Sequence, residues 1–214
     1  MADRIDPTDR RTIAAVILAA GSSRRFGEAN KLLADVAGRP LIAHIVATFL
    51  SAQVPDIIVV TGPDPEAIQS ALANASIRFV HNPNHLSGMG SSVATGIAAL
   101  SDQHSGALVC PGDMPGISGS FVDELIGAFF AAGANRVIRP LLADGRPAHP
   151  VLWPARLFPV LEKLSGPEGG RQVLDALATD VMTLKSNNAD AALDIDTQDD
   201  LDALRIRLQK QHSS

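Results

Sequence analysis

Tyrosine is absent from this chain of 214 residues, and aromatic residues make up only 4% of it. Alanine, valine, leucine and isoleucine must therefore supply most of the core, a composition that suits helices packed on a sheet. The single cysteine, Cys110, excludes an internal disulfide and a cysteine-rich metal site. Because Cys110 lies in the apolar run GALVC, we expect a small buried side chain there.

Charged residues are also scarce, at 19% of the chain, and the net charge is -5. This balance favours neither nucleic acid nor an anionic membrane surface as a partner. No segment reaches the roughly 20 apolar residues of a membrane span. The opening MADRIDPTDRR is not followed by an apolar stretch long enough for a signal sequence. We therefore expect a cytoplasmic protein whose important positive charge is local.

Short β-branched runs alternate with helical patterns along the chain. This alternation predicts a Rossmann-like α/β fold, a mostly parallel sheet with helices on both faces. The predicted strands are apolar throughout, as expected when helices cover both faces of a sheet. Strands are expected at 12–20, 56–62, 77–82, 106–113, 136–140 and 180–185, and helices at 40–52, 65–75, 91–100, 118–133, 154–164, 168–178 and 198–209.

The regular alternation breaks after residue 140. The segment LLADGRPAHPVLW predicts a hairpin with Asp144-Gly145 as its turn. No linker or repeat divides the chain, so we expect one domain over 11–210, with flexible ends at 1–10 and 211–214.

The stretch VILAAGSSRRFG begins as a buried strand and ends as a flexible, basic loop. Ligands of open α/β sheets bind outside the carboxyl ends of the strands, where this loop begins. Small residues let backbone N–H groups approach an anion, and basic side chains can neutralise phosphate oxygens. A Gly/Ser turn with solvated basic residues is the alternative. The predicted polyphosphate cradle consists of Gly21, Ser22, Ser23, Arg24, Arg25 and Lys31.

Two acids follow apolar runs at predicted strand ends. Asp113 follows LVCPG, and Asp196 ends LDID together with Asp194. Carboxylates at such positions suit Mg²⁺, which prefers oxygen ligands and neutralises phosphates. A turn or helix-capping role is the alternative for Asp113. Thr197 is expected to cap the last helix, with acids in its first turn.

A second Gly/Ser loop, NHLSGMGSSVATG, precedes the helix expected at 91–100. Ser91 or Ser92 is a suitable N-cap for that helix. Capping alone is enough to account for these serines, so a ligand-binding role is an alternative rather than a requirement.

Several segments together resemble one enzyme family. They are LAAGSSRRFG with Lys31-Leu32-Leu33, GRPLIAH, SGMGSSVATG, GDMP, GRPAHPVLW and DIDTQDDL, in order from about 13 to 205. They resemble the nucleotidyltransferases of molybdenum cofactor maturation, in the MobA-like NTP transferase superfamily, most closely the molybdopterin cytidylyltransferase-like branch. The resemblance implies a fold like that of nucleotide-diphospho-sugar transferases. It also implies a nucleotide-binding half at about 11–115 and an acceptor half, with the hairpin, at about 116–210.

The same resemblance implies roles for individual residues. The LAAG form of the first loop goes with cytidine, so CTP is the expected nucleotide. Arg25 and Lys31 would contact the triphosphate, and Asp113 and Asp196 would bind Mg²⁺, with Arg25, Lys31 and Asp113 acting in catalysis. The expected nucleotide-binding residues are Leu18, Ala19, Ala20, Gly21, Ser22, Ser23, Gly88 and Met89.

The acceptor site is expected in the second half of the chain. His149 could contact a pterin or its phosphate together with Arg146, and Arg171 and Ser91 are further candidates. A packed or surface histidine and a solvated arginine at a helix start are the alternatives. Trp153 is expected to belong to the core rather than to stack on a ligand.

The implied reaction is an attack of an acceptor phosphate on the α-phosphorus of the nucleotide, with pyrophosphate leaving in line. Molybdopterin or its molybdenum complex is the expected acceptor, and a molybdoenzyme or its chaperone is a possible recipient. GTP as donor, or a sugar phosphate as acceptor, would keep the same chemistry. A non-catalytic carrier that hands a nucleotide-bearing cofactor to a molybdoenzyme is the alternative from another class.

Overall fold

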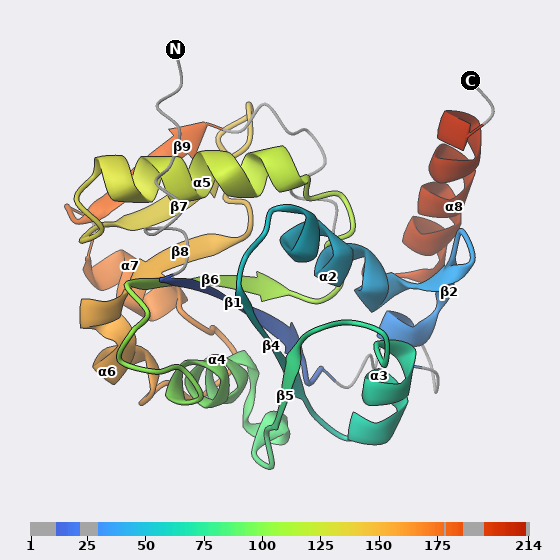
Figure 1. The fold of residues 1–214 in the computed structure, drawn as a ribbon, viewed down its shortest axis with the longest axis horizontal. Coiled ribbons are helices and arrows are strands. Elements are labelled where there is room, and N and C mark those ends of the chain that lie inside the picture. The colour runs from blue at the N-terminus through green and yellow to red at the C-terminus, as the bar shows by residue number, and fades with distance from the viewer. Residues whose placement is uncertain (1–11, 22–29, 178, 186–194, 213–214) are drawn as a thin grey trace.

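One seven-stranded sheet forms the centre of the protein, with the strand order β5-β4-β1-β6-β8-β7-β9 (Figure 1). The computed structural model describes residues 12–21, 30–177, 179–185 and 195–212, with side chains to 206 in the last range. The strands of this sheet are β1 (Ile13–Ala19), β4 (Asp56–Thr61), β5 (Arg78–His81), β6 (Gly106–Pro111), β7 (Val137–Leu141), β8 (Val151–Pro154) and β9 (Val181–Lys185).

Helices lie on both faces of the sheet (Figure 1). Figure 1 shows α2 and α5 on one face and α4, α6 and α7 on the other, with α8 at one side beside the small strand pair β2–β3. The helices and the short strands are η2 (Lys31–Leu33), β2 (Asp35–Val36), β3 (Arg39–Pro40), α2 (Leu41–Ser51), α3 (Pro65–Ala71), η3 (His85–Ser87), α4 (Met89–Ala98), α5 (Gly119–Ala131), η4 (Ala155–Leu157), α6 (Phe158–Leu161), α7 (Arg171–Ala176) and α8 (Gln198–His212).

The predicted α/β class and mostly parallel sheet are confirmed. Strand β1 pairs in parallel with both β4 and β6, and β7 pairs in parallel with β9. Strand β8 is the exception, because it lies antiparallel between β6 and β7. It returns from β7 through the predicted hairpin, whose turn includes Gly145 at a φ of 84°. A positive φ suits glycine, so Asp144-Gly145 is a correct turn signal.

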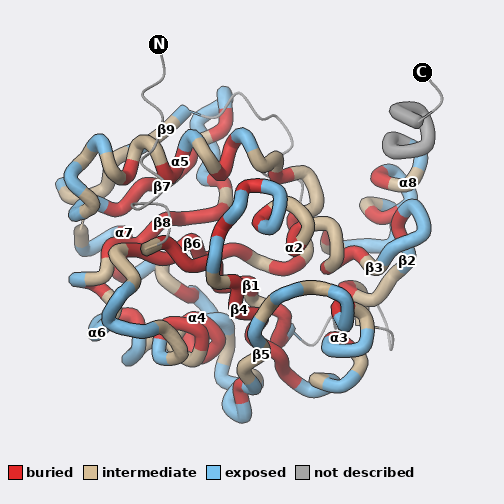
Figure 2. The backbone as a smooth tube through the Cα atoms, viewed as in Figure 1, coloured by how far each residue is buried: buried red, intermediate tan, exposed pale blue. Residues whose placement is uncertain are grey.

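The helix α2 shows why this sequence makes a layered core. Its apolar residues recur at helical spacing, and the buried ones are coloured red in Figure 2. All of the buried residues except Leu41 belong to the same core as residues of α5. Ser118 caps α5 by accepting a hydrogen bond from the Phe121 N–H at 3.3 Å. The buried residues of α2 are Leu41, Ile42, Ile45, Val46 and Phe49.

The opposite face of the sheet packs against α4, α6 and α7. Gly96 brings α4 close to the sheet, because a Cβ at this position would lie 2.2 Å from the Val16 Cγ1. The buried residues of this second core include Val60, Val137 and Trp153. Cys110 is buried in the first core, as predicted, and burial raises the pKa of its thiol.

The starts of two helices differ from the prediction. The helix α4 starts at Met89 with Gly88 as its N-cap, so Ser91 and Ser92 lie within the first turns rather than at the cap. The helix α7 starts at Arg171 rather than at 168. Gly169 has a φ of 56°, which a right-handed helix does not contain, so α7 cannot start earlier.

The C-terminal helix is longer than predicted. α8 continues to His212, past the expected end at 209, so two residues of the predicted flexible end at 211–214 are helical. The predicted flexible end at 1–10 lies outside the described residues. Within the described ranges, we find no helix with the length and apolar character needed to cross a membrane.

Candidate active site

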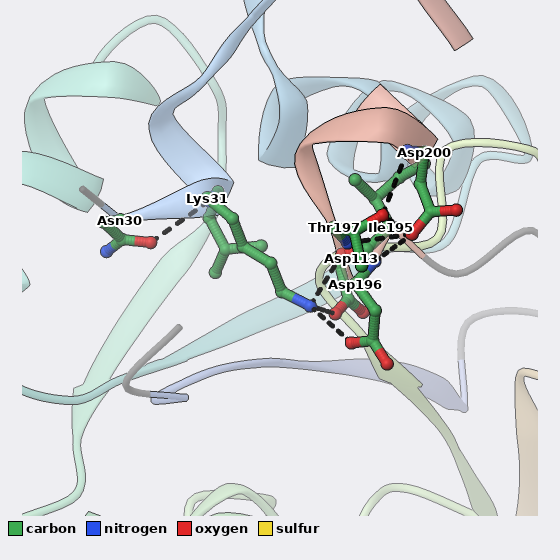
Figure 3. Close-up of polar contacts among 8 residues, drawn as sticks. Asn30, Lys31, Asp113, Ile195, Asp196, Thr197 and Asp200 are labelled. Atoms are coloured by element: carbon green, nitrogen blue, oxygen red, sulfur yellow. Dashed lines mark hydrogen bonds and ion pairs between the residues drawn. The ribbon is translucent and has the colours of Figure 1, made fainter. Parts of the chain in front are cut away.

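A lysine joins two carboxylates at the carboxyl end of the central strands (Figure 3). The Lys31 Nζ lies 2.5 Å from the Asp113 Oδ2 and 3.3 Å from the Asp196 Oδ1. It also donates a hydrogen bond of 2.8 Å to the Ile195 carbonyl oxygen. The Lys31 and Asp113 side chains are each 14% exposed, against 45% for Asp196. The site therefore opens to solvent on the Asp196 side.

Three separate segments position this Lys31–Asp113–Asp196 cluster. Asp113 follows the end of β6, and its carbonyl oxygen accepts a hydrogen bond from the Ile195 N–H at 3.4 Å. Lys31 is the first residue of η2, whose N-cap Asn30 accepts from the Leu32 N–H at 3.1 Å. Backbone contacts, and not a shared strand, thus bring residues 113 and 195 together.

The predicted strand end at Asp196 is wrong, whereas the predicted cap at Thr197 is confirmed. Ile195 and Asp196 have no strand structure, and Asp194 lies outside the described residues. The Thr197 Oγ1 accepts from the Asp200 N–H at 3.2 Å, and the Asp200 Oδ2 accepts from the Thr197 N–H at 2.8 Å. This reciprocal pair fixes the start of α8 just after Asp196.

One oxygen of the cluster is buried with no hydrogen-bond partner among the described residues. It is the Asp113 Oδ1. A buried carboxylate oxygen without a partner is costly, so it suits a further cation. Asp113 and Asp196 together offer oxygen ligands, which are the ligands that hard divalent ions prefer. No group of three or more metal-binding side chains occurs in the part of the chain that is described.

A cavity of about 620 Å³ is open next to His149 and the sheet. Its floor is one face of the sheet, formed by β1, β6, β7 and β8, and α4 and α7 contribute its walls. This volume lies within the range typical of small-molecule sites. The lining residues are Leu18, Met89, Val93, Val109, Pro111, Arg139, Pro147, Ala148, His149, Val151, Trp153, Glu168, Gly170, Arg171, Leu174 and Asp175.

The cavity brings together residues that were predicted to bind two different substrates, the nucleotide and the acceptor. Leu18 and Met89 were expected near the nucleotide, and His149 and Arg171 near the acceptor, and all four line this cavity. Trp153 belongs to the core, as predicted, but it also lines the cavity.

Backbone positions assigned to the nucleotide flank the cavity without lining it. Ala19 and Ala20 are buried, and Gly21 is exposed. Gly88 packs on the backbone of Gly166, because a Cβ on Gly88 would lie 2.4 Å from the Gly166 carbonyl carbon and oxygen. The predicted residues Ser22, Ser23, Arg24 and Arg25 lie outside the described residues.

Two residues expected near the acceptor do not line this cavity. The Arg146 side chain is 70% exposed and its Nε lies 2.7 Å from the Asp144 Oδ2, within the hairpin turn. Ser91 is buried, and its hydroxyl donates to the Asn84 and Gly88 carbonyl oxygens at 2.9 and 2.8 Å. These contacts give Ser91 a structural role at the start of α4.

Two residues near the site, Arg139 and Asn82, were not predicted from the sequence. Arg139 lies in β7 and lines the cavity. Asn82 is fully buried and donates from its Nδ2 to the hydroxyls of Ser91 and Ser92, which anchors α4. Arg139 is the charged residue inside the apolar run VIRPL, and such a charge is a signal that the sequence could have provided.

Burial makes His149 a determinant of stability. Its Nδ1 is buried with no hydrogen-bond partner among the described residues. Burial lowers the pKa of His149 from 6.5, the nearby Asp113 charge opposes this shift, and the Arg139 charge adds to it. The imidazole is therefore held neutral in the folded protein.

We predict that the protein loses stability in acid through His149. The unfolded chain takes up a proton on His149 at a higher pH than the folded protein does. The free energy of unfolding should therefore be undiminished above pH 6.5 and fall below it, by up to about 1.4 kcal/mol per pH unit. Denaturant unfolding between pH 7 and 5 measures this slope.

The matched variant for this test is His149→Gln. In this variant the free energy of unfolding should fall less steeply between pH 7 and 5. Some of the fall should remain, because burial also lowers the pKa of His44. An unchanged slope in His149→Gln would contradict a buried neutral imidazole at this position.

Comparison with known proteins gives a family match over most of the chain. Residues 15–181 match the model of the MobA-like NTP transferase domain. The chain is 30% identical over 196 residues to nicotine blue oxidoreductase of Paenarthrobacter nicotinovorans, covering 89% of this chain and 95% of that protein. It is also 38% identical over 109 residues to the bifunctional protein GlmU of Sinorhizobium fredii, covering 49% of this chain. This match spans only 24% of that GlmU, so the chain corresponds to about a quarter of its length.

Solved structures share the fold. An Rv0371c homologue from Mycobacterium sp. strain JC1 has a TM-score of 0.80 at 25% identity, over 95% of this chain and 98% of that one. A nucleotidyl transferase from Methanothermobacter thermautotroptrophicus has a TM-score of 0.79 at 21% identity, over 94% and 99% of the two chains.

Proposed function

The chain belongs to the MobA-like NTP transferase family, and from this premise we propose that it transfers CMP from CTP to the phosphate of a molybdopterin-type acceptor. The family is one of nucleotidyltransferases, the EC 2.7.7 class of enzymes. An oxygen of the acceptor phosphate forms the new bond to the α-phosphorus. The bond from the α-phosphorus to the bridging oxygen breaks, and pyrophosphate leaves with that electron pair.

The observation that carries this proposal is the Lys31–Asp113–Asp196 cluster, whose Asp113 comes two residues after Pro111 of the cavity lining. A carboxylate pair that can hold a cation and an ammonium group suit a reaction in which charge develops on phosphate oxygens. The cavity offers room for a ring system along the apolar residues of its floor. This pairing of charge with an apolar cavity supports nucleotidyl transfer to a heterocyclic acceptor.

We propose that Asp113 and Asp196 hold a divalent metal ion, Mg²⁺ in the cell. The unpartnered Asp113 Oδ1 fits this role. A structure of Rv0371c from Mycobacterium tuberculosis contains manganese, and this neighbour is 21% identical with a TM-score of 0.73. When bound, such an ion neutralises phosphate charge and polarises the phosphorus that is attacked.

The chain's own residues supply positioning and charge. Lys31 pairs with both carboxylates in the free protein, and in our proposal its ammonium group turns to the triphosphate when the nucleotide binds. Arg25 is the second cation proposed for the departing pyrophosphate. The backbone around Gly21 and Gly88, with the Leu18 and Met89 side chains, would hold the base and ribose.

Pyrophosphate release is the direct test of this function. The purified protein is incubated with Mg²⁺ and molybdopterin, and with CTP, GTP or ATP in turn. Release with CTP alone supports the proposal, and release with GTP keeps the chemistry but rejects the cytidine preference. Tight nucleotide binding without any release would support a non-catalytic cofactor carrier instead.

A second candidate function is a redox reaction. It is favoured by the relative that covers nearly the whole chain, which is named an oxidoreductase. The decisive assay is reduction of nicotine blue with NADH or NADPH, followed by absorbance. Turnover in this assay, with no pyrophosphate release from any nucleotide, would replace the transfer reaction.

A further inference from the structure

Arg139 stands apart from the other arginines of the protein. Among the arginines whose side chains are described, it alone has no hydrogen bond or ion pair to a described residue. The others each contact a carboxylate, a carbonyl oxygen or a histidine ring. A guanidinium group is always charged and has five donors, so an arginine left without partners inside a cavity suits an external anion.

The fold points Arg139 at the cavity rather than at solvent. In β7 the side chains alternate, so Arg139 shares the sheet face of Val137, which belongs to the second core. Arg139 is half-buried and lines the cavity with the apolar residues Val151 and Trp153. A cation in such surroundings costs free energy unless an opposite charge pairs with it.

Neither acid that lines the cavity forms an ion pair with Arg139. Glu168 makes no ion pair with any described basic residue. Asp175 lies 3.9 Å from Arg171, in an exposed contact along α7. Burial lowers the pKa of His149 and so favours its neutral form. Arg139 is thus a cation of the cavity floor with no ion-pair partner among the described residues.

Arg139 shares this cavity with His149. His149 lies two residues before β8, the strand that pairs with β7. A ligand held at Arg139 would therefore occupy the cavity that His149 also lines.

We propose that Arg139 binds an anionic group of the acceptor, a phosphate or a carboxylate, and selects anionic planar heterocycles over neutral ones. The inference rests on the proposed function and assigns the acceptor a charged contact that the sequence had placed at Arg146. The floor suits a ring system, because Trp153 and the apolar residues of one sheet face form most of it. His149 lines the same cavity.

Trp153 makes this inference measurable without catalysis. It is the single tryptophan of a chain that has no tyrosine, and it lines the cavity. Quenching of its fluorescence therefore reports a ligand in this cavity. The two probes are pterin-6-carboxylate and pterin, which share a ring and differ in the anionic group.

We expect the wild-type protein to bind pterin-6-carboxylate about 10- to 100-fold more tightly than pterin. A charge-assisted hydrogen bond from Arg139 to the carboxylate would give a preference of this size. Arg139→Gln should lose most of this preference and Arg139→Lys should keep part of it. The matched control is Arg136→Gln, because Arg136 lies just before β7, is exposed and contacts only the Thr179 carbonyl oxygen among the described residues. It should bind both probes as the wild type does.

Two results would overturn the role of Arg139. One is a wild-type protein that binds neither probe or does not distinguish them, and the other is an Arg139→Gln variant that keeps the preference. Pyrophosphate release is scored separately. A preference lost in Arg139→Gln, in a protein that releases no pyrophosphate from any nucleotide, would leave the anion site standing and reject the transfer reaction.

Discussion

Asp113→Asn is expected to lower the rate of pyrophosphate release by about 100- to 1,000-fold, the cost of removing one preorganised charge from an active site. Asparagine keeps the shape of the side chain but removes the charge that faces the Lys31 Nζ at 2.5 Å. It also weakens the proposed metal site, since a neutral amide is a poorer ligand for a hard cation. Steady-state release assays with Mg²⁺ and CTP measure the change.

The matched control for this variant is Asp102→Asn. Asp102 is an exposed aspartate between α4 and β6, away from the cluster. It should keep its activity within about twofold, as surface substitutions usually do. Thermal unfolding of both variants separates lost chemistry from lost folding. A folded Asp113→Asn protein with nearly wild-type turnover would remove Asp113 from the reaction.

Gly88→Ala is expected to destabilise the protein by about 2–4 kcal/mol and to weaken nucleotide binding. Gly88 has a φ of 110°, and an added Cβ would lie 2.4 Å from the backbone of Gly166. Backbone atoms cannot rotate away as a side chain does, so α4 or the 166–170 segment must move. Both border the cavity, through Met89 and Gly170.

Gly133→Ala is the control that isolates the contact in this experiment. Gly133 has a φ of 74°, and no atom lies within 4 Å of the position that an added Cβ would occupy. The Gly133→Ala variant should therefore lose only about 1 kcal/mol of stability, the cost of holding alanine at a positive φ. Chemical denaturation compares the two variants, and CTP titration follows binding. Equal destabilisation by both would mean that the Gly88–Gly166 contact contributes nothing.

The order of strands and helices was predictable because local signals determine it. Apolar runs such as IAAVILA need covering on both faces, and the Asp144-Gly145 turn fixes where β8 returns. The position of Asp113 after a buried strand follows from the same pattern. The family was also recognisable from the motifs, since LAAGSSRRFG and its partners occur in a fixed order along the chain.

The family resemblance grouped Asp113 and Asp196 at one metal ion, but the contacts that hold them together were beyond the sequence. Lys31 meets Asp113 and Asp196 across about 80 and 165 residues of chain, and the Ile195–Asp113 backbone contact helps to hold the last segment there. In the sequence, Arg139 is a single charge within an apolar strand. Its place in the cavity, without a hydrogen-bond or ion-pair partner among the described residues, depends on how the helices cover that face of the sheet. Local propensity thus determined the elements of this protein, whereas packing across the sheet decided which charges face a common site.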